Sequence, residues 1–396
     1  MQNSLPLAAI RVIDFGRFIA GPYCAMLLAD MGADVIRIER RQGSEDRYLA
    51  PVADTGEGCG FLSLNRNKRS LTLDLGKQES GVVVRRLVET ADVVVANLPI
   101  EVLKKVGLDY ETLKAIRPDV IFARVSTFGP DGPYARRVGF DAVAQAMSGA
   151  MSLTGFPGAP VRSVVPFEDY GTALHTAFGV MVALYHRGKT GDGQVVDGSL
   201  LATGITFMQN VLAERHVLGI ERRQMGNTSF YAAPGDAYRT KDGWIVVSVA
   251  GGERFGRWAR LVGREEFITD SRFGDDQHRA DNYQPITEAM NAWLASRSSA
   301  QAIAELEAAR IPAGPVHDPG QVLADRQVKA RGLLQDVDFP GVSRPVPLAA
   351  PAVTLSLTPG KIRHRAPMVG EHTDEVLREL GYSIEEIAEF RKAEIV

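Results

Sequence analysis

Residues 10–38 read IRVIDFGRFIAGPYCAMLLADMGADVIRI, and this stretch decides the fold. Apolar residues 10–14 predict a buried strand, residues 16–22 a glycine-bearing turn, and residues 23–31 a helix. Residues 34–38 predict a second strand. A strand, a helix and a further strand in this order are typical of a βαβ unit with parallel strands.

The same alternation continues along the first half of the chain. Further strands are expected at residues 71–75, 93–96 and 120–125, with helical stretches at 78–89 and 111–116 between them. Strands that alternate with helices form a parallel sheet with helices on both faces. The sequence therefore predicts an α/β fold with a doubly wound parallel sheet.

A second, smaller α/β domain is expected in the middle of the chain. Two long apolar helices are expected at residues 172–186 and 198–218, and the pattern then restarts with a strand at residues 244–249 and three helical stretches. We therefore place the large domain at residues 1–220 and the small domain at residues 221–330.

Residues 331–396 are expected to form a linker and a C-terminal segment. Prolines are frequent between residues 340 and 351, and each proline disfavours helical backbone in the residue before it, so this stretch is expected to be extended. Two helices are expected to close the chain. In the second, Ser383 and Glu386 have the spacing of a capping box.

The composition argues against several classes of partner. The 396 residues include 45 Lys and Arg and 48 Asp and Glu, a formal charge of −3, whereas nucleic-acid binding needs a basic surface. The longest apolar run, residues 177–185, is too short to span a membrane. The N-terminus has no secretion signal, and Cys24 and Cys59 cannot form a disulfide framework, so we expect a cytoplasmic protein.

Common catalytic signatures are absent. No G-x-S-x-G motif occurs, and the seven histidines neither cluster nor form H-E-x-x-H, so no metal is expected. The turn at residues 14–22 lacks the dinucleotide fingerprint, yet it leads into a helix N-terminus, which favours anions. Basic stretches at residues 37–41 and 65–69 could neutralise phosphate groups or could simply be solvated surface.

Asp169 has two possible roles. It lies in the sequence PFEDYG, directly before the helix expected at residues 172–186. Aspartate is a preferred helix cap, so its role could be structural. The positive end of a helix also stabilises an ionised carboxylate, which in a pocket can act as a nucleophile. The spacing leaves both possibilities open.

Six motifs, taken together, resemble the class III coenzyme A transferases, the family of formyl-CoA and carnitine CoA-transferases. The resemblance covers nearly the whole chain. The motifs are Val12-Ile13-Asp14-Phe15 with Ala20-Gly21-Pro22, Gly32-Ala33-Asp34-Val35-Ile36-Arg37-Ile38-Glu39, Asn67-Lys68-Arg69-Ser70-Leu71, Gly129-Pro130-Asp131-Gly132-Pro133-Tyr134, Lys189-Thr190-Gly191-Asp192-Gly193-Gln194 and Gly370-Glu371-His372-Thr373.

The resemblance implies a fold and an assembly. The large domain would be Rossmann-like, built from the N-terminal half together with residues 331–396, which return to it. Two chains would thread through one another as an interlocked homodimer. Threading needs long linkers, and residues 198–218 and 340–351 are suitable.

The resemblance also implies a reaction, the transfer of coenzyme A from an acyl-CoA to a small carboxylic acid. The family's nucleophile matches Asp169. It would form a mixed anhydride with the acyl group, then an aspartyl-CoA thioester that the acceptor acid attacks. Coenzyme A, present as the acyl-CoA substrate, would be the only cofactor. The positions that match coenzyme A contacts in the family are Phe18, Ile19, Ala20, Arg40, Lys77, Asn97, Leu98, Lys105, Arg137 and Phe140.

Two departures from relatives bear on the substrate and the reaction. Members that use oxalate carry a run of glycines where this chain has residues 226–231, GNTSFY, so oxalate is not expected and a dicarboxylate such as succinyl-CoA is a first trial. Related 2-methylacyl-CoA racemases have Gly-His-Asp where this chain has Gly139-Phe140-Asp141. Without this histidine, one of the two bases that racemisation at the α-carbon needs is missing. A racemase or epimerase, and a non-catalytic acyl-CoA binding protein, remain the alternatives.

Overall fold

The computed structural model describes residues 5–396, which divide into two compact units. The first unit comprises residues 5–149, 163–209 and 326–396, and the second comprises residues 150–162 and 210–325. The division near residues 209 and 325 lies close to the domain borders predicted at residues 220 and 330. The domain borders themselves stay a prediction.

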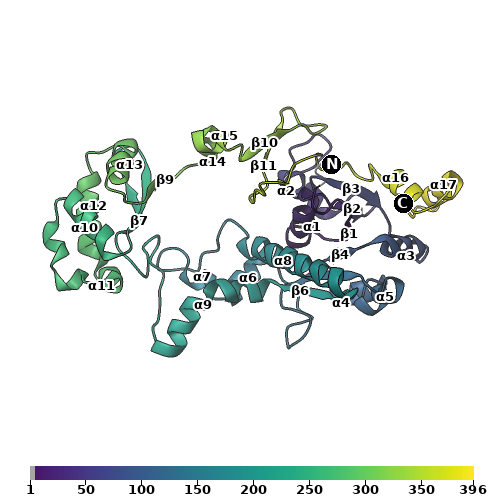
Figure 1. Cartoon of the computed structure of the whole chain (residues 1–396), viewed down its shortest axis with the longest axis horizontal. Helices are drawn as coiled ribbons and strands as arrows, with labels where there is room; N and C mark the ends of the chain where they lie inside the picture. Colours follow the sequence, from purple (N-terminus) through teal and green to yellow (C-terminus); the bar gives the residue numbers. More distant parts are fainter. Residues whose placement is uncertain (1–4) are drawn as a thin grey trace. The chain divides into compact units, whose positions relative to one another are not determined.

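The first unit is built on a six-stranded parallel sheet with the strand order β3-β2-β1-β4-β5-β6 (Figure 1). This order reverses direction at β1 and β4, the arrangement of a doubly wound Rossmann-like sheet, so the predicted fold class is confirmed. The strands are β1 (Arg11–Asp14), β2 (Asp34–Glu39), β3 (Lys68–Thr72), β4 (Val93–Ala96), β5 (Ile121–Ser126) and β6 (Val195–Ser199).

Helices cover both faces of this sheet. On one face α3 (Ser80–Thr90) and α5 (Tyr110–Ile116) pack with the closing helices α16 (Thr373–Glu379) and α17 (Ile384–Lys392). On the other face lie α1 (Ala20–Asp30) and α8 (Phe167–Thr190). Strand residues therefore alternate between two apolar cores, which is why these strands read as continuous apolar runs.

The first unit also contains several shorter elements. They include the 3-10 helix η1 (Glu45–Tyr48), α2 (Cys59–Leu64), α4 (Ile100–Lys105), α6 (Asp141–Met147) and α15 (Arg326–Ala330). An antiparallel pair, β10 (Leu334–Val337) and β11 (Val346–Ala349), packs on α2. The predicted extended backbone between residues 340 and 351 thus includes a strand, and the capping box of Ser383 and Glu386 is confirmed.

The second unit holds an antiparallel sheet of β7 (Gly235–Arg239), β8 (Trp244–Ser248) and β9 (Ala313–Pro315). One apolar core lies between this sheet and its helices. Helix α7 (Ala150–Leu153) also belongs to this unit. The larger helices are α10 (Gly252–Leu261), α11 (Asp276–Asp281), α12 (Tyr283–Leu294), α13 (Ser299–Ala308) and α14 (Pro319–Ala324).

Several element predictions were wrong at their borders, among them the strand expected at residues 71–75, because β3 occupies Lys68–Thr72. Helix α1 begins at Ala20 rather than at residue 23, and α8 begins five residues before the predicted start at residue 172. The helix predicted at residues 198–218 is preceded by strand β6, and α9 (Leu200–Leu218) begins only after it. Strand β6 was missed because Gly198 interrupts its short apolar pattern. Glycine is needed there because a Cβ at this position would clash with the Thr176 side chain. Within residues 5–396, no helix combines the length and apolarity that a membrane span requires.

Candidate active site

The turn after β1 is held from two sides. Phe18 has a φ of 62°, in the left-handed region that residues with side chains rarely adopt. Its backbone N–H donates to Asp46 Oδ2 at 3.1 Å. Asn97, which follows β4, accepts the N–H of Arg17 and donates to the Arg17 carbonyl oxygen, both at 2.7 Å. The turn is therefore a fixed backbone feature at the carboxyl edge of the sheet.

Behind this turn lies a group of buried, oppositely charged side chains, which we term the ion-paired cluster. Lys68 Nζ lies 2.8 Å from Asp14 Oδ2, and both Asp46 oxygens accept from Arg37 Nη2 at 2.9 Å. Burial raises the pKa of Glu39, but two arginines outweigh burial and bring this pKa to about 2. The members are Asp14, Arg37, Glu39, Asp46, Arg47 and Lys68.

Asp141 caps the N-terminus of α8. Its Oδ2 accepts the backbone N–H of Glu168 at 2.9 Å and that of Asp169 at 3.1 Å. Because α8 begins at Phe167, Asp169 is the third residue of the helix and not its cap. The capping role considered for Asp169 is thus wrong, and Asp141, the first residue of α6, takes it.

Asp169 itself is a partly buried acid without a cation beside it. Within residues 5–396 its carboxylate makes no hydrogen bond or ion pair, and burial, followed by the neighbouring Asp141 carboxylate, raises its pKa to about 7. The sequence predicted that the helix N-terminus would favour the ionised form. That effect is lost because the first N–H groups already bind Asp141.

Glu168 is a third carboxyl group at this position, and it was not predicted from the sequence. Its side chain has no exposed surface, and Ser148 Oγ lies 2.7 Å from its Oε1. Burial raises the pKa of Glu168, and the Ser148 hydrogen bond lowers it. The negative charges of Asp141 and Asp169 raise it further, so that the pKa is about 7. Two adjacent acidic residues, at positions 168 and 169, were the sequence feature that could have indicated a role for Glu168. We term Asp141, Glu168 and Asp169 the carboxyl cluster.

Small residues and aromatic contacts fix the position of α8. A Cβ on Gly171 would come within 2.7 Å of the Phe207 ring on α9, so the two helices are in close contact. On another side α1 packs against α8, and the rings of Tyr23 and Tyr170 meet edge to face with centroids 5.0 Å apart. The helix that carries Asp169 is thereby packed against the helix that follows the Phe18 turn.

Several of the predicted coenzyme A contacts lie together at the carboxyl edge of the sheet. Phe18 and the 58% exposed Phe140 meet edge to face at 5.4 Å, and Phe140 directly precedes Asp141. An aromatic pair, of which Phe140 is exposed and Phe18 is half-buried, thus adjoins the carboxyl cluster. The turn and the end of β4 contribute the other members of this group, Ile19, Ala20, Asn97 and Leu98.

The basic residues predicted to bind coenzyme A are spread over the surface. Arg40 and Lys105 are exposed, and Arg40 lies 3.9 Å from Glu45. Lys77 donates to the carbonyl oxygen of Ala393. The Arg137 guanidinium lies 4.7 Å from the centroid of the Tyr134 ring. The structure leaves their predicted roles untested.

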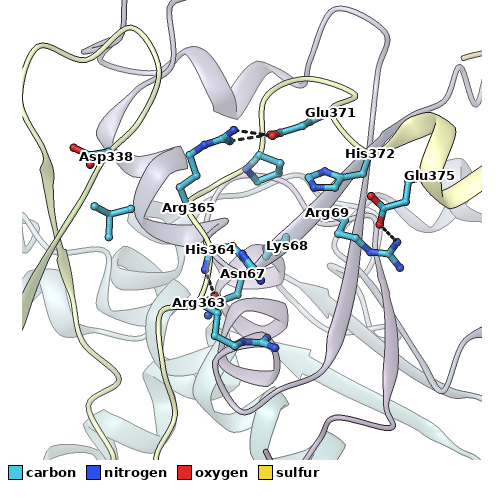
Figure 2. A pocket seen from close by; sticks show the side chains of 12 residues that line it. Asn67, Lys68, Arg69, Asp338, Arg363, His364, Arg365, Glu371, His372 and Glu375 are labelled. Carbon is cyan, nitrogen blue, oxygen red and sulfur yellow. Dashed lines mark hydrogen bonds and ion pairs between the residues drawn. The ribbon is translucent and has the colours of Figure 1, made fainter.

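A separate hollow of about 540 Å³ lies in the first unit, between the start of β3 and the loop before α16 (Figure 2). Two of its arginines are paired: Arg365 binds Glu371 in a bidentate manner, and Arg69 Nη1 binds Glu375 at 2.8 Å. None of the predicted site residues lines it. The residues predicted to react or to bind coenzyme A therefore lie outside this hollow.

The carboxyl cluster is the arrangement best suited to chemistry. Asp169 is partly exposed, has no cation beside it within residues 5–396, and has a pKa of about 7, which are the properties of a nucleophilic carboxylate. No group of three or more His, Cys, Asp or Glu side chains that could hold a metal ion occurs among residues 5–396.

Comparisons with known proteins agree on one family. The sequence profile of CoA-transferase family III matches residues 7–373. A succinyl-CoA–L-malate CoA-transferase beta subunit from Chloroflexus aurantiacus is 36% identical over 100% of this chain and 99% of its own length. A succinate–glutarate CoA-transferase from Agrobacterium fabrum is 33% identical over 95% of this chain and 96% of its own length. The crystal structure of a CAIB/BAIF family protein from Brucella suis, 34% identical, matches with a TM-score of 0.84 over 96% of this chain and 100% of that chain.

Proposed function

This chain belongs to CoA-transferase family III, and we propose that Asp169 is the nucleophile through which it moves coenzyme A from an acyl-CoA thioester to a carboxylic acid. Transfer between an acyl-CoA and a carboxylate is the activity of the family. The route through Asp169, the substrate pair and the assembly are the parts that we propose.

In the proposed reaction an Asp169 oxygen attacks the thioester carbonyl carbon. The C–S bond breaks, coenzyme A leaves as a thiolate, and a mixed anhydride remains. The thiolate attacks the aspartyl carbonyl carbon, which releases the donor acid and leaves an aspartyl-CoA thioester. The acceptor carboxylate displaces the thiolate again, and attack of the thiolate on the acceptor's carbonyl carbon gives the new acyl-CoA and free Asp169.

A single observation carries this proposal: Asp169 is a carboxylate with a raised pKa and no cation beside it. A neighbouring lysine or arginine would lower both the pKa and the nucleophilicity of the carboxylate. Asp141 instead holds the backbone of Asp169 and leaves its side chain unbound. Partial burial also limits the access of water, which would hydrolyse an anhydride.

We propose that coenzyme A binds along the carboxyl edge of the sheet. Phe18, Ile19, Ala20 and the end of β4, with Asn97 and Leu98, offer backbone and apolar contacts there. Phe140 would lie near the thioester because it precedes Asp141. The cations among the proposed contacts suit the phosphate groups of coenzyme A, and they are the exposed Arg40, Lys105 and Arg137 and the half-buried Lys77.

For substrates we propose a succinyl-CoA donor and a small dicarboxylic acceptor. The two transferases described above are named for succinate or succinyl-CoA with malate or glutarate, all of which are dicarboxylic acids. The donor and the acceptor would each bring one negatively charged carboxylate besides the reacting group. The cytoplasm, where the thiols of Cys24 and Cys59 would stay reduced, is the proposed compartment.

We propose that the assembly is an interlocked homodimer, because α8 carries an uncovered apolar stripe. Leu174, Phe178, Met181 and Tyr185 recur at helical spacing and are 50%, 71%, 41% and 66% exposed. A second copy of the chain would cover this stripe. Light scattering should give twice the mass of the chain, and Phe178→Glu should lower it. A monomeric wild type would contradict the proposal, as would dimerisation only with a different subunit.

The decisive test of the nucleophile is Asp169→Asn. We expect transfer of coenzyme A from succinyl-CoA to glutarate to fall by at least about a thousandfold. Mass spectrometry of the wild type mixed with succinyl-CoA should find a covalent coenzyme A adduct on the peptide that contains Asp169. The exposed Asp336 on β10 provides a matched control, since Asp336→Asn should keep both activity and adduct.

Two outcomes would contradict this proposal. Turnover retained in Asp169→Asn would remove the nucleophile. Binding of acyl-CoA by the wild type with neither adduct nor turnover would mean a binding protein.

A further inference from the structure

Ser148 has more acceptors than it can serve if Glu168 is ionised. Its Oγ lies 2.7 Å from Glu168 Oε1 and 3.3 Å from the carbonyl oxygen of Gln145. A hydroxyl group has one proton and so can donate to only one of them. If Glu168 is protonated it donates to Ser148, Ser148 donates to Gln145, and both contacts are satisfied.

The surroundings of Glu168 also lack the groups that a buried anion needs. The side chain is fully buried, its Oε2 has no hydrogen-bond partner among residues 5–396, and a Cβ on Gly204 of α9 would clash with Oε1. A buried carboxylate without a second donor or a cation is costly.

The titratable groups that face Glu168 offer it no positive charge. From α6 comes Asp141 and from α8 itself comes Asp169, while His175 Nδ1 lies 3.4 Å from Thr203 Oγ1 of α9. Residues 200–209 of α9 carry no titratable side chain. Both charged neighbours are therefore acids.

We propose that Glu168 is a positioning residue that remains protonated while Asp169 is ionised, so that the first turn of α8 carries one negative charge instead of two. This inference rests on the proposed role of Asp169 as nucleophile. The protonated carboxyl group closes a ring of contacts: Glu168 binds Ser148, the Gln145 side chain binds Asp141, and Asp141 holds the backbone of Asp169. A second charge in this turn would repel both the coenzyme A thiolate and the acceptor carboxylate during their attacks on the aspartyl carbonyl.

Infrared titration of the full-length protein tests the protonation directly. In Asp169→Asn, a carboxylic acid C=O band should persist to about pH 6, well above the ordinary titration range of glutamate, and should vanish in Asp169→Asn/Glu168→Gln. Absence of the band, or a band that survives Glu168→Gln, would overturn the proposal. Because the readout needs no turnover, it holds even if Asp169 proves not to be the nucleophile.

Kinetics with two substitutions at position 168 test the consequence for catalysis. Glutamine mimics a neutral glutamate, so Glu168→Gln should keep kcat within about threefold of the wild type near pH 6.5 and should remove a fall in rate at alkaline pH. Glu168→Ala breaks the ring of contacts and should lower kcat by about tenfold or more at every pH. Equal losses in both variants across the pH range would overturn the charge argument. Retained turnover in Asp169→Asn would instead overturn the nucleophile.

Discussion

The ion-paired cluster and the carboxyl cluster are both buried, yet burial has opposite results in them. In the first, Arg37 and Arg47 hold the pKa of Glu39 at about 2 although burial alone would raise it. In the second, burial acts without a cation, and the pKa values of Glu168 and Asp169 rise to about 7. The charge of the neighbours, not the depth, decides the direction.

This difference separates a structural role from a chemical one. The carboxylates of the ion-paired cluster are fully occupied, and one of them, Asp46, fixes the backbone of Phe18. Asp169 has an unoccupied carboxylate in an environment that raises its proton affinity. Carboxylates whose oxygens are all paired hold a turn in place, whereas a carboxylate without partners can react.

The largest effect should come from breaking the ion-paired cluster. Glu39→Gln removes the charge between two buried arginines, so we expect a loss of about 3–5 kcal/mol in the free energy of unfolding. Urea denaturation at neutral pH measures it. Glu45→Gln serves as the control, because Glu45 makes only an exposed contact with Arg40 at 3.9 Å, and its loss should cost less than about 1 kcal/mol. A similar loss in both variants would mean that the buried pairing does not stabilise this unit.

The two clusters should also give stability an opposite dependence on pH. The folded pKa of Glu39 lies below its ordinary value of 4.5, so its contribution is present above that value and is lost as pH falls toward about 2. The folded pKa of Glu168 lies above 4.5, so its contribution is present at acid pH and is lost as pH rises through about 7.

The free energy of unfolding, measured by urea denaturation between about pH 2.5 and pH 8.5, should therefore pass through a maximum. Its total variation should be on the order of 2–3 kcal/mol. Glu39→Gln should flatten the acid side of this curve, and Glu168→Gln should flatten the alkaline side. If each variant changed the other side of the curve, the assignment of the two directions would be refuted.

Much of the fold could be predicted from the sequence because the strands of the parallel sheet are apolar runs separated by amphipathic helices. The borders were less accessible. Strand β6 contains Asp197 and Gly198, which interrupt its apolar pattern, and the start of α8 at Phe167 depends on a cap supplied from elsewhere in the chain. No local pattern encodes a capping carboxylate that lies 26 residues before the helix begins, at Asp141.

The candidate site was predicted in part. Asp169 was singled out by its place before an apolar helix and by the family resemblance, but no sequence pattern shows how its charge is set. Glu168 and Asp141 enter the site through tertiary contacts with Ser148 and with the start of α8. Periodicity and motif spacing describe neighbours along the chain, and these contacts join α6 to α8.

A smaller effect is expected where α9 presses on the carboxyl cluster. In Gly204→Ala the new methyl group would overlap Glu168 Oε1 and the Ser148 side chain, so the hydrogen bond between them must lengthen or rotate. We expect a loss of about 1–3 kcal/mol in the free energy of unfolding and a lower kcat with little change in KM for succinyl-CoA. Gly188→Ala on α8 is the control, because a Cβ there meets no atom within 4 Å. An unchanged kcat in Gly204→Ala would indicate that the position of Glu168 is not needed for catalysis.

The smallest effect concerns an aromatic contact between two residues that adjoin the two clusters. Phe18, whose N–H is bound by Asp46, meets Phe140, which directly precedes Asp141, at a centroid distance of 5.4 Å. An edge-to-face pair contributes about 0.5–1.5 kcal/mol beyond burial, and a double-mutant cycle with Phe18→Leu and Phe140→Leu should recover a coupling of that size from KM for succinyl-CoA. Coupling in KM would mean that the structural cluster places the turn against the reactive one when coenzyme A binds. Strictly additive effects would mean that the two clusters act on coenzyme A independently, and the contact would then be only a surface packing feature.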